Sequence, residues 1–277
     1  MPNYVMNVVT IKGNESQIER AYAVCCDMDF NKMIPMPETL NVTSGSTTSQ
    51  ALGAYVASII GSDTTKWTND DVKQFTEIVR VAGSRENLED MVNSSEKYLS
   101  WYAIEGEVDV EHPYGKESDD ISYLWATSTY NYKDKEPKNR ADAVAFGRVL
   151  YENIKKYGYP TWYDWCCDNW GTKWNASDVD VEKDVDWIEY QFTTAWGAPT
   201  GIMDYLAETL VDLEISWNFA DEDLGCNCAL LVKKAGSTEY ETIDEENLSV
   251  ACAVWGYDED EIRAEYEEEE EYDEEDD

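Results

Sequence analysis

The chain has 277 residues with 43% hydrophobic and 13% aromatic side chains, a composition typical of a folded protein with one large or two small domains. It carries 59 acidic against 21 basic residues, for a formal net charge of −38. Because nucleic acids and anionic membrane surfaces are bound mainly through Lys and Arg, this charge excludes both as direct partners and favours basic proteins. The alternatives are that the acidity keeps the protein soluble or that the host cytoplasm is salty.

The seven cysteines are an odd number, with adjacent pairs at 25–26 and 166–167 and a Cys-x-Cys at 226–228. This is not the spacing of a disulfide framework, so we expect reduced thiols and a cytoplasmic protein. The N-terminal sequence lacks the basic start and apolar run of a signal peptide, and no 18-residue apolar stretch occurs in the sequence.

Residues 1–42 predict a strand followed by a helix. The strand covers residues 4–11 (YVMNVVTI), which are rich in β-branched and aromatic side chains. Asn14 and Gln17 have the spacing of a capping box, and apolar residues at helical spacing follow them. Two prolines make residues 30–37 an edge strand or an extended arm.

Residues 43–138 predict a mainly helical insert. A small polar connector at 43–49 comes first. Three segments with apolar residues at helical spacing follow, at 51–60, 68–82 and 85–104. The acidic stretch 105–120 is loop-like and holds the only histidine, and residues 121–132 alternate enough to be a strand or hairpin arm.

Residues 139–257 predict a helix, the aromatic stretch described below and then a further group of strands. The helix covers 140–157 and ends at Gly158 and Pro160. The later elements are a strand at 186–196, a helix at 202–210, and strands at 213–219, 226–233 and 240–243.

Taken with the N-terminal strand and helix, this order of elements predicts an α+β fold. We expect a split ferredoxin-like antiparallel sheet with helices on one face, interrupted by the mainly helical insert. Residues 258–277 hold 15 acidic residues and one Arg, and they predict a disordered acidic C-terminal tail.

Four tryptophans and two tyrosines lie within residues 158–176 (GYPTWYDWCCDNWGTKWNA). Such side chains bury large areas and usually need a partner for the ring N–H or O–H. The stretch therefore predicts either a structural cluster of aromatic side chains that packs a helix against the sheet or a binding site. We assign the structural role to five tryptophans: Trp162, Trp165, Trp170, Trp174 and Trp196.

Four sequence segments together resemble the YubB-like ferredoxin-like family of phage and conjugative-plasmid proteins. They read MPNYVMNVVTIKG, DFNKMIPMP, TWYDWCCDNWGTKWNA and FTTAWGAP, and they occur in this order along the chain. The resemblance covers roughly residues 1–40 and 139–240, and it implies a split ferredoxin-like sheet with a variable helical insert. It implies no activity and therefore no catalytic residue. Residues 45–135 and the acidic tail have no counterpart in the resemblance.

No catalytic or cofactor motif is recognisable, so we expect no enzyme, no cofactor and no metal. The only histidine, His112, has no Ser or Cys nucleophile near it in an acidic loop. No phosphate-binding glycine motif is present. The cysteines form a zinc site only if they converge in space. Asp164 and Asp168 have the spacing for a shared cation if the stretch is helical, but helix capping or pairing with Lys173 is a simpler role.

The leading functional hypothesis is an inhibitor that presents a DNA-mimicking negative surface to a host nucleic-acid-binding defence protein, such as a nuclease, a restriction enzyme or a CRISPR-type effector. The partner expected is thus a basic host protein, and a homodimer is a further expectation. The acidic clusters assigned to this surface are Glu105, Glu107, Asp109, Glu111, Asp119, Asp120, Asp178, Asp180, Glu182, Asp184, Asp186, Asp221, Glu222 and Asp223, with the tail in addition.

The alternative hypothesis is an adaptor or inhibitor that binds one host protein through exposed aromatic side chains, with the acidity serving solubility. Salt distinguishes the two hypotheses, because binding between opposite charges weakens as salt rises, whereas an interface of buried aromatic side chains does not. Outside the tail, the chain still carries a net charge of −24, so deletion of the tail does not remove the predicted surface.

Overall fold

The computed structural model describes residues 3–76, 85–105, 140–245 and 247–266. The chain divides into two compact units. Unit 1 comprises Met1–Pro35 and Cys166–Asp277, and unit 2 comprises Met36–Trp165. Unit 2 is therefore inserted between the two parts of unit 1 along the chain, and each unit is described by itself.

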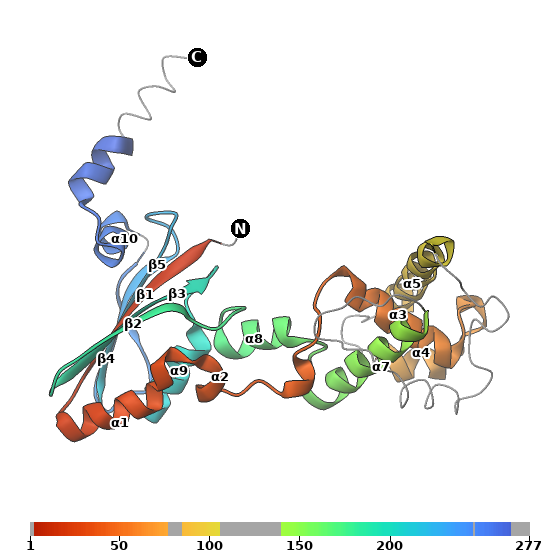
Figure 1. Ribbon diagram of the computed structural model, residues 1–277, viewed down its shortest axis with the longest axis horizontal. Coiled ribbons are helices and arrows are strands. Elements are labelled where there is room, and N and C mark those ends of the chain that lie inside the picture. Colours follow the sequence, from red (N-terminus) through yellow and green to blue (C-terminus); the bar gives the residue numbers. More distant parts are fainter. Residues whose placement is uncertain (1–2, 77–84, 106–139, 246, 267–277) are drawn as a thin grey trace, which may run out of the picture. The chain divides into compact units, whose positions relative to one another are not determined.

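Unit 1 is built on one six-stranded antiparallel sheet in the order β2-β3-β1-β4-β5-β6 (Figure 1). Helix α1 connects β1 toward β2 and helix α9 connects β3 to β4, which is the ferredoxin-like order of elements. The predicted fold class is confirmed, and β5 and β6 extend the sheet beyond β4. The elements are β1 (Tyr4–Lys12), α1 (Glu15–Cys25), β2 (Ser177–Lys183), β3 (Trp187–Ala195), α9 (Thr200–Thr209), β4 (Glu214–Asp221), β5 (Cys228–Lys233) and β6 (Glu241–Glu245).

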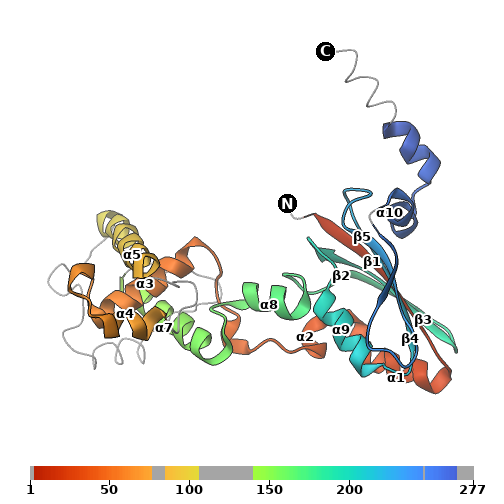
Figure 2. The same ribbon diagram turned by 180° about the vertical axis from the view of Figure 1, so that it is seen from behind.

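The main core of unit 1 lies between the sheet and helices α1 and α9, which lie on the same side of it in both views (Figures 1 and 2). Alternate residues of β1 face these helices and are fully buried. This is expected for a strand with one buried face, because successive side chains point to opposite faces of a sheet. The Phe192 ring contacts Phe30 and Trp217 edge to face, with 6.0 Å between ring centroids in each pair. Phe30 lies in the short helix α2 (Phe30–Met33).

A polar contact fixes the centre of this core. Trp217 Nε1 donates a hydrogen bond to Asn7 Oδ1 at 3.1 Å, and Asn7 Nδ2 donates to Thr194 Oγ1 at 2.9 Å and to the Val5 carbonyl at 3.0 Å. The buried amide of Asn7 is thus paired on both sides, so it joins β1, β3 and β4 without an unsatisfied polar group.

Helix α1 begins with the predicted capping box, which is confirmed. The Asn14 side chain accepts from the Gln17 backbone N–H at 3.2 Å, and Gln17 Oε1 accepts from the Asn14 N–H at 2.9 Å. The helix ends in the 3-10 turn η1 (Cys26–Met28), where three consecutive non-glycine residues have positive φ values of 48°, 55° and 55°. Burial of Met28 in the core accompanies this strained turn.

The opposite face of the sheet is partly covered by helix α10 (Leu248–Trp255). Val250 and Ala251 of α10 pack against Ala220 of β4 and Cys228 of β5, which forms a second, smaller apolar cluster. Figures 1 and 2 both place α10 on the side of the sheet away from α1 and α9. The rest of this face stays open to solvent and is called the open face below.

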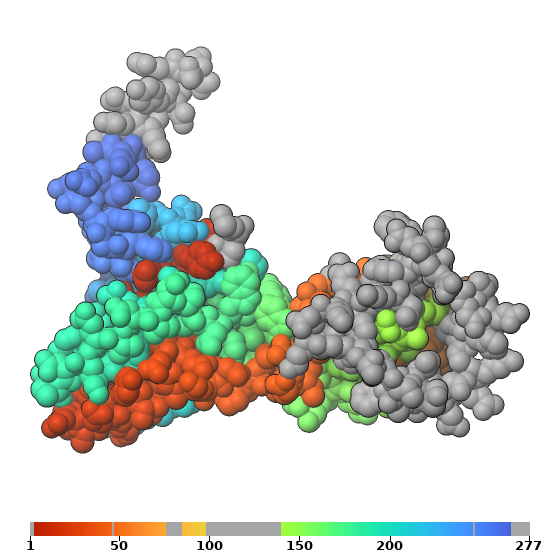
Figure 3. Space-filling view, in the orientation of Figure 1, coloured from red at the N-terminus to blue at the C-terminus, as the bar shows by residue number. Residues whose placement is uncertain are grey.

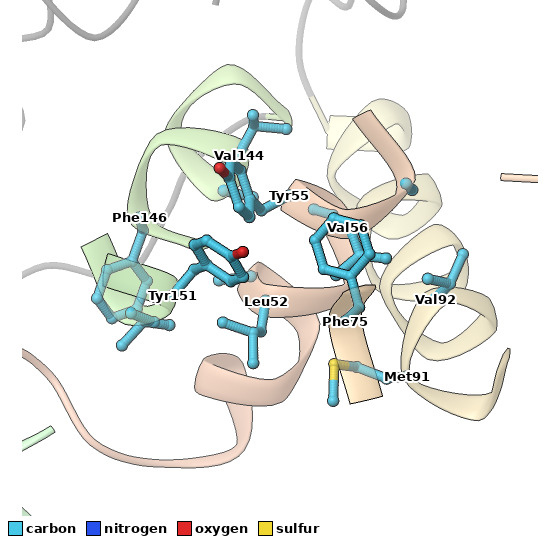
Figure 4. Close-up of a cluster of buried hydrophobic side chains, with 14 of the residues drawn as sticks. Leu52, Tyr55, Val56, Phe75, Met91, Val92, Val144, Phe146 and Tyr151 are labelled. Carbon is cyan, nitrogen blue, oxygen red and sulfur yellow. The ribbon is translucent and has the colours of Figure 1, made fainter. Parts of the chain in front are cut away.

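Unit 2 is helical throughout its described elements. Its core packs α3 against α5 and α7, with Leu52, Tyr55 and Tyr151 among the central side chains (Figure 4). Gly147 of α7 lies against the Ala51 carbonyl, where an added Cβ would be 1.9 Å from the oxygen, so only glycine fits this crossing. The elements are η2 (Glu38–Leu40), α3 (Ser46–Ile60), η3 (Thr64–Lys66), α4 (Asn69–Thr76), α5 (Arg85–Glu105), α7 (Arg140–Tyr157) and α8 (Trp162–Trp170), the last of which extends into unit 1.

Several local predictions differ from the structure. Residues 30–37 were expected to be extended, but α2 forms there because Phe30 and Met33 are buried one helical turn apart. The predicted connector 43–49 is helical from Ser46 onward. The strand predicted at 121–132 lies outside the described residues. Residues 259–266, at the start of the tail predicted to be disordered, form a helix, with the Asp258 carboxylate accepting from the Asp260 and Glu261 N–H groups.

The grouping of residues into domains also differs at one helix. The sequence analysis grouped α7 with the ferredoxin-like part, whereas its apolar side packs into the core of unit 2 through Phe146, Leu150 and Ile154. Among the residues that the structure describes, no helix is both long and apolar enough to cross a membrane.

Candidate functional site: an acidic sheet face

Strand β2 carries the acidic cluster that the sequence analysis singled out at 178–186. Asp180 lies opposite Gln191 of β3, and Glu182 lies opposite Glu189. Because side chains alternate along a strand, these residues point to the open face, while Val181 and Lys183 face α1 and the core. Asp180 and Glu182 are exposed, so β2 presents carboxylates as a row along the edge of the sheet.

Further carboxylates lie on the same face of other strands, with uncharged residues between them. Glu189 of β3 accepts a hydrogen bond from Thr10 Oγ1 at 2.8 Å, and Glu214 of β4 lies opposite Lys12 of β1. On the far side, Asp244 of β6 pairs with Leu230 of β5. We define the acidic sheet face as five carboxylates drawn from four strands: Asp180, Glu182, Glu189, Glu214 and Asp244.

The strand register brings two carboxylates of the acidic sheet face together. Glu182 and Glu189 occupy directly opposite positions on neighbouring strands, where Cβ atoms lie about 5 Å apart. Like charges at such positions destabilise a sheet. The arrangement is therefore not explained by stability alone. Figure 3 shows the β2–β3 segment, in teal, as a continuous surface beside α1 in red.

Within the described residues, unit 1 has no Lys or Arg residue that is both exposed and without a carboxylate partner. The unit contains eight Lys and Arg residues, all of them in the described part of the chain. Six form ion pairs with a carboxylate, and two are buried. The paired residues are Lys12, Arg20, Lys32, Lys183, Lys234 and Arg263, and the buried ones are Lys173 and Lys233.

The two buried lysines show how the fold removes positive charge from solvent. Lys233 is fully buried, and its ammonium donates to the carbonyls of Leu210, Val211 and Leu213 at 2.8, 3.2 and 2.6 Å. Loss of hydration lowers the pKa of Lys233 below its ordinary value. Lys173 is 7% exposed and lies against two indole rings. Neither ammonium offsets the carboxylates at the surface.

Other predicted acidic residues occupy different places. Asp184 and Asp186 are exposed in the β2–β3 turn, and Glu222 and Asp223 are exposed after β4. Asp221 differs from the prediction, because it is buried and accepts hydrogen bonds from Asn3, Asn227 and the Asp223 N–H. It therefore holds the β4–β5 loop and is not part of the surface. Asp178 is exposed and accepts from Thr193 Oγ1 at 3.2 Å.

The acidic cluster predicted in the insert cannot be placed on a surface. Glu105 is the last residue of α5, and the structure describes its backbone only. The other members lie outside the described residues: Glu107, Asp109, Glu111, Asp119 and Asp120.

The aromatic stretch divides into structural and exposed tryptophans. Trp165 and Trp170 are buried and Trp162 is half-buried, and Trp170 Nε1 donates to the Ile34 carbonyl at 2.9 Å while its ring contacts Phe30 at 6.0 Å. These three tryptophans have the buried or half-buried environment expected of a structural aromatic cluster. Trp174 and Trp196 differ, because they are 43% and 51% exposed.

Two of the buried thiols are held in the protonated form. Burial raises the pKa of the Cys25 thiol to about 12, and it does the same for Cys166. Both thiols therefore stay protonated and unreactive near neutral pH. No cluster of His, Cys, Asp or Glu in the described residues has the geometry of a metal site. His112 lies outside the described residues.

Three carboxylates of the acidic sheet face were missed by the sequence analysis: Glu189, Glu214 and Asp244. Glu189 and Glu214 each stand alone between apolar or aromatic neighbours, and Asp244 begins a short acidic run, residues 244–246, that the sequence analysis did not single out. The signal that finds them is strand alternation combined with the pairing register, and the second of these is not readable from one sequence.

Comparison with known proteins gives a fold and no activity. Protein Api92 from Yersinia pseudotuberculosis, known from a crystal structure, aligns with a TM-score of 0.38 and 10% identity over 88% of this chain and 99% of that one. No curated protein matches this chain. These findings give no support to the YubB-like assignment or to a phage or plasmid origin. Residues 169–276 match the family model described as the ferredoxin-like domain in Api92-like protein, so this part of the chain is similar to that domain.

Proposed function

We propose that unit 1 binds a Lys- and Arg-rich surface of another protein that itself binds nucleic acid, and that the acidic sheet face takes the place of the phosphates there. The observation that carries this proposal is the state of the eight cations of unit 1, each of which is buried or ion-paired. Glu214 of the acidic sheet face is itself paired with Lys12 at 3.7 Å, but carboxylates outnumber the cations of unit 1, so negative potential dominates around the sheet and attracts a basic partner.

Two further observations support a role in binding. Glu182 and Glu189 lie directly opposite each other although this destabilises the sheet. The face is also rigid, because five carboxylates lie on strands of one sheet and not on loops. Charges fixed in this way form a surface that is already organised for a partner before binding.

We also propose which class of host protein is bound. A nuclease, a restriction enzyme or a CRISPR-type effector has a groove lined with Lys and Arg that normally binds phosphates. Inhibition of such a host defence protein in the cytoplasm, by a protein encoded on a phage or plasmid, is the setting that we propose. Its basis is the resemblance of the sequence segments to YubB-like proteins.

A second candidate function is an adaptor or inhibitor that binds through exposed aromatic side chains. The observation that favours it is the exposure of Trp174 and Trp196 at one end of the sheet. Exposed tryptophans are common anchors in protein interfaces. In this case the acidity would serve solubility, and binding would persist in high salt.

The two candidates are separated by capture of binding proteins from a bacterial lysate on the intact chain, followed by two elutions. We expect the bound protein to leave as salt rises from 0.05 to about 0.5 M, because screening weakens charge attraction. We also expect an excess of a DNA duplex to release it at low salt, because DNA competes for the same groove. A partner that resists both elutions contradicts the proposal and favours the aromatic interface.

A matched pair of variants locates the surface. The triple substitution Asp180→Asn, Glu182→Gln and Asp244→Asn removes three charges from the acidic sheet face, and should weaken binding of the captured protein about tenfold. The control removes three exposed charges from unit 2 through Asp70→Asn, Asp90→Asn and Glu152→Gln, and should weaken it much less. Equal effects of the two sets would show that only the total charge matters, which contradicts a defined acidic face.

A further inference from the structure

A lysine ammonium lies between two exposed tryptophans at one end of the sheet. Lys173 Nζ is 3.9 Å from the centroid of the Trp174 ring and 3.4 Å from that of Trp196. Lys173 is 7% exposed, whereas the two tryptophans are 43% and 51% exposed. The cation therefore occupies the inner sides of both rings, and the rings present their remaining surface to solvent.

The backbone holds Trp196 in this exposed position. Its φ is +70°, a region that bulky residues rarely adopt, so the conformation is strained. Its N–H donates to the Asn3 carbonyl at 2.9 Å, and its carbonyl accepts from Asn227 Nδ2 at 3.3 Å. The preceding carbonyl, that of Ala195, accepts from Thr172 Oγ1 at 2.9 Å. The backbone of Trp196 is thus held by hydrogen bonds on both sides, and its side chain is 51% exposed.

Carboxylates lie on two sides of the tryptophan pair. Asn227 joins the Trp196 carbonyl to Asp221, and the next residues, Glu222 and Asp223, are exposed. The Glu222 N–H donates to the Tyr4 carbonyl at 3.0 Å, which places this loop beside the start of β1. On the other side, Asp178 of β2 accepts from Thr193 of β3. These hydrogen bonds place the segments that carry the acidic residues next to the end of β3, which leads into Trp196.

We propose that Trp174, Trp196, Glu222 and Asp223 form a binding site for an arginine side chain of a basic partner, called the arginine site below. The guanidinium would stack on the outer indole surface while the carboxylates accept its N–H groups, a combination that suits Arg in particular. This inference rests on the proposed function, because it names the side chain by which the basic partner is recognised.

The chemistry of the two basic side chains predicts that the site prefers arginine to lysine. An ammonium is a compact, strongly hydrated charge that is attracted to an aromatic ring mainly by the ring quadrupole. Lys173 already occupies the inner sides of both rings and opposes a second point charge nearby. A guanidinium is planar and weakly hydrated, so it gains contact area by stacking and forms paired hydrogen bonds with a carboxylate.

Charge also argues against a second copy of this chain as the occupant. Another copy would bring its own carboxylates, and every cation of its unit 1 is already buried or paired. Like-charged surfaces repel at close range. A segment rich in Arg has the complementary charge and the planar groups that the exposed indoles accommodate.

The test compares two labelled peptides of equal length and charge, octa-arginine and octa-lysine, by fluorescence anisotropy with the full chain at about 0.15 M salt. The wild-type protein should bind the arginine peptide about tenfold more tightly than the lysine peptide. The double variant Trp174→Leu/Trp196→Leu should lose this ratio. The variant Glu222→Gln/Asp223→Asn should weaken binding of the arginine peptide and reduce the ratio while keeping both rings.

Tyr22 provides a matched control, because it is 40% exposed and carries a lysine, Lys183, 4.7 Å from its ring centroid. Tyr22→Leu should retain the tenfold ratio. If the double variant does not fold, as judged by circular dichroism, Trp196→Asn replaces it, since Asn tolerates a positive φ. That single variant should also reduce the ratio.

The outcomes separate this inference from the proposed function. Equal affinity of the wild-type protein for both peptides, or an unchanged ratio in the tryptophan variants, overturns the arginine site. If that equal affinity still falls with salt, the acidic face remains supported. If neither peptide binds at about 0.05 M salt, both the arginine site and the acidic binding surface are overturned.

Discussion

Lys233 is the most deeply buried cation of unit 1. Its ammonium is buried at the end of α9, where the last carbonyl groups of a helix lack partners within the helix. Three carbonyl oxygens from Leu210, Val211 and Leu213 accept its N–H groups. A positive charge at a helix C-terminus is also favoured by the helix dipole. The residue therefore joins β5 to the α9–β4 turn.

We expect Lys233→Met to lower the free energy of unfolding by about 3 kcal/mol, because it leaves buried carbonyl groups without donors. Urea unfolding followed by circular dichroism measures this loss. Lys234→Met is the neighbouring control, since Lys234 is exposed and pairs with Glu241 at the surface, and it should leave stability nearly unchanged. Similar midpoints for Lys233→Met and the wild-type protein would show that the ammonium does not hold this turn.

Single residues also mark the limit of prediction from sequence. The capping pair Asn14 and Gln17 is readable because its two partners are three residues apart. The burial of Asp221 is not readable, because its partner Asn3 lies 218 residues away. Trp196 has a positive φ, and no sequence pattern predicts such a backbone conformation at a non-glycine residue. Its exposure was therefore not predictable.

At the scale of elements, helix α10 determines how much of the sheet stays open. Its Asn247 side chain accepts from the Val250 N–H at 2.9 Å, and Gly256 ends it with φ of +74°. Trp255 Nε1 donates to the Asp221 carbonyl at 3.0 Å, which fixes the helix to the end of β4. The helix thus covers the part of this side of the sheet around Ala220 and Cys228, and the open face remains.

We expect Asn247→Ala to destabilise α10 by about 1 kcal/mol, since an N-cap side chain supplies an acceptor that alanine lacks. Amide hydrogen exchange should then accelerate about fivefold in α10. The matched control is Asn14→Ala, which removes the cap of α1 and should accelerate exchange there and not in α10. A change spread equally over both helices in either variant would contradict local capping.

The order of elements explains which part of the fold was predictable. Strands β1, β3, β4 and β5 carry apolar residues at strand spacing, so the sequence indicates them together with the ferredoxin-like order. Strand β2 was missed because its sequence, SDVDVEK, is almost wholly exposed and is the outermost strand. An edge strand with one polar face has little apolar periodicity. The element that carries the predicted acidic cluster was therefore the one not recognised as a strand.

At the scale of the whole molecule, the negative charge is divided between the folded units and the tail. Residues 258–277 contribute −14 of the net −38, and −24 remains without them. Asp258 caps the helical segment 259–266, and Arg263 pairs with Glu259 within it. Tail and sheet therefore carry separate sets of carboxylates, and their contributions to binding can be measured apart.

We expect deletion of residues 258–277 to leave the melting temperature nearly unchanged, because the core clusters lie elsewhere in the chain. Partner binding should weaken and its salt dependence should become less steep, but binding should persist through the remaining acidic surface. A salt titration of the captured partner against both chain lengths measures this. Complete loss of binding by the shortened chain would identify the tail, and not the acidic sheet face, as the binding element.

The position of β1 in the sheet has a consequence for biosynthesis. Residues 4–12 pair with residues 187–195 and 214–221, so β1 leaves the ribosome well before the two strands that pair with it. Contacts this distant in sequence close slowly. Meanwhile a segment rich in β-branched residues stays unpaired and prone to aggregation. Unit 2 is synthesised during this interval, so the sheet of unit 1 assembles only after the insert has been completed.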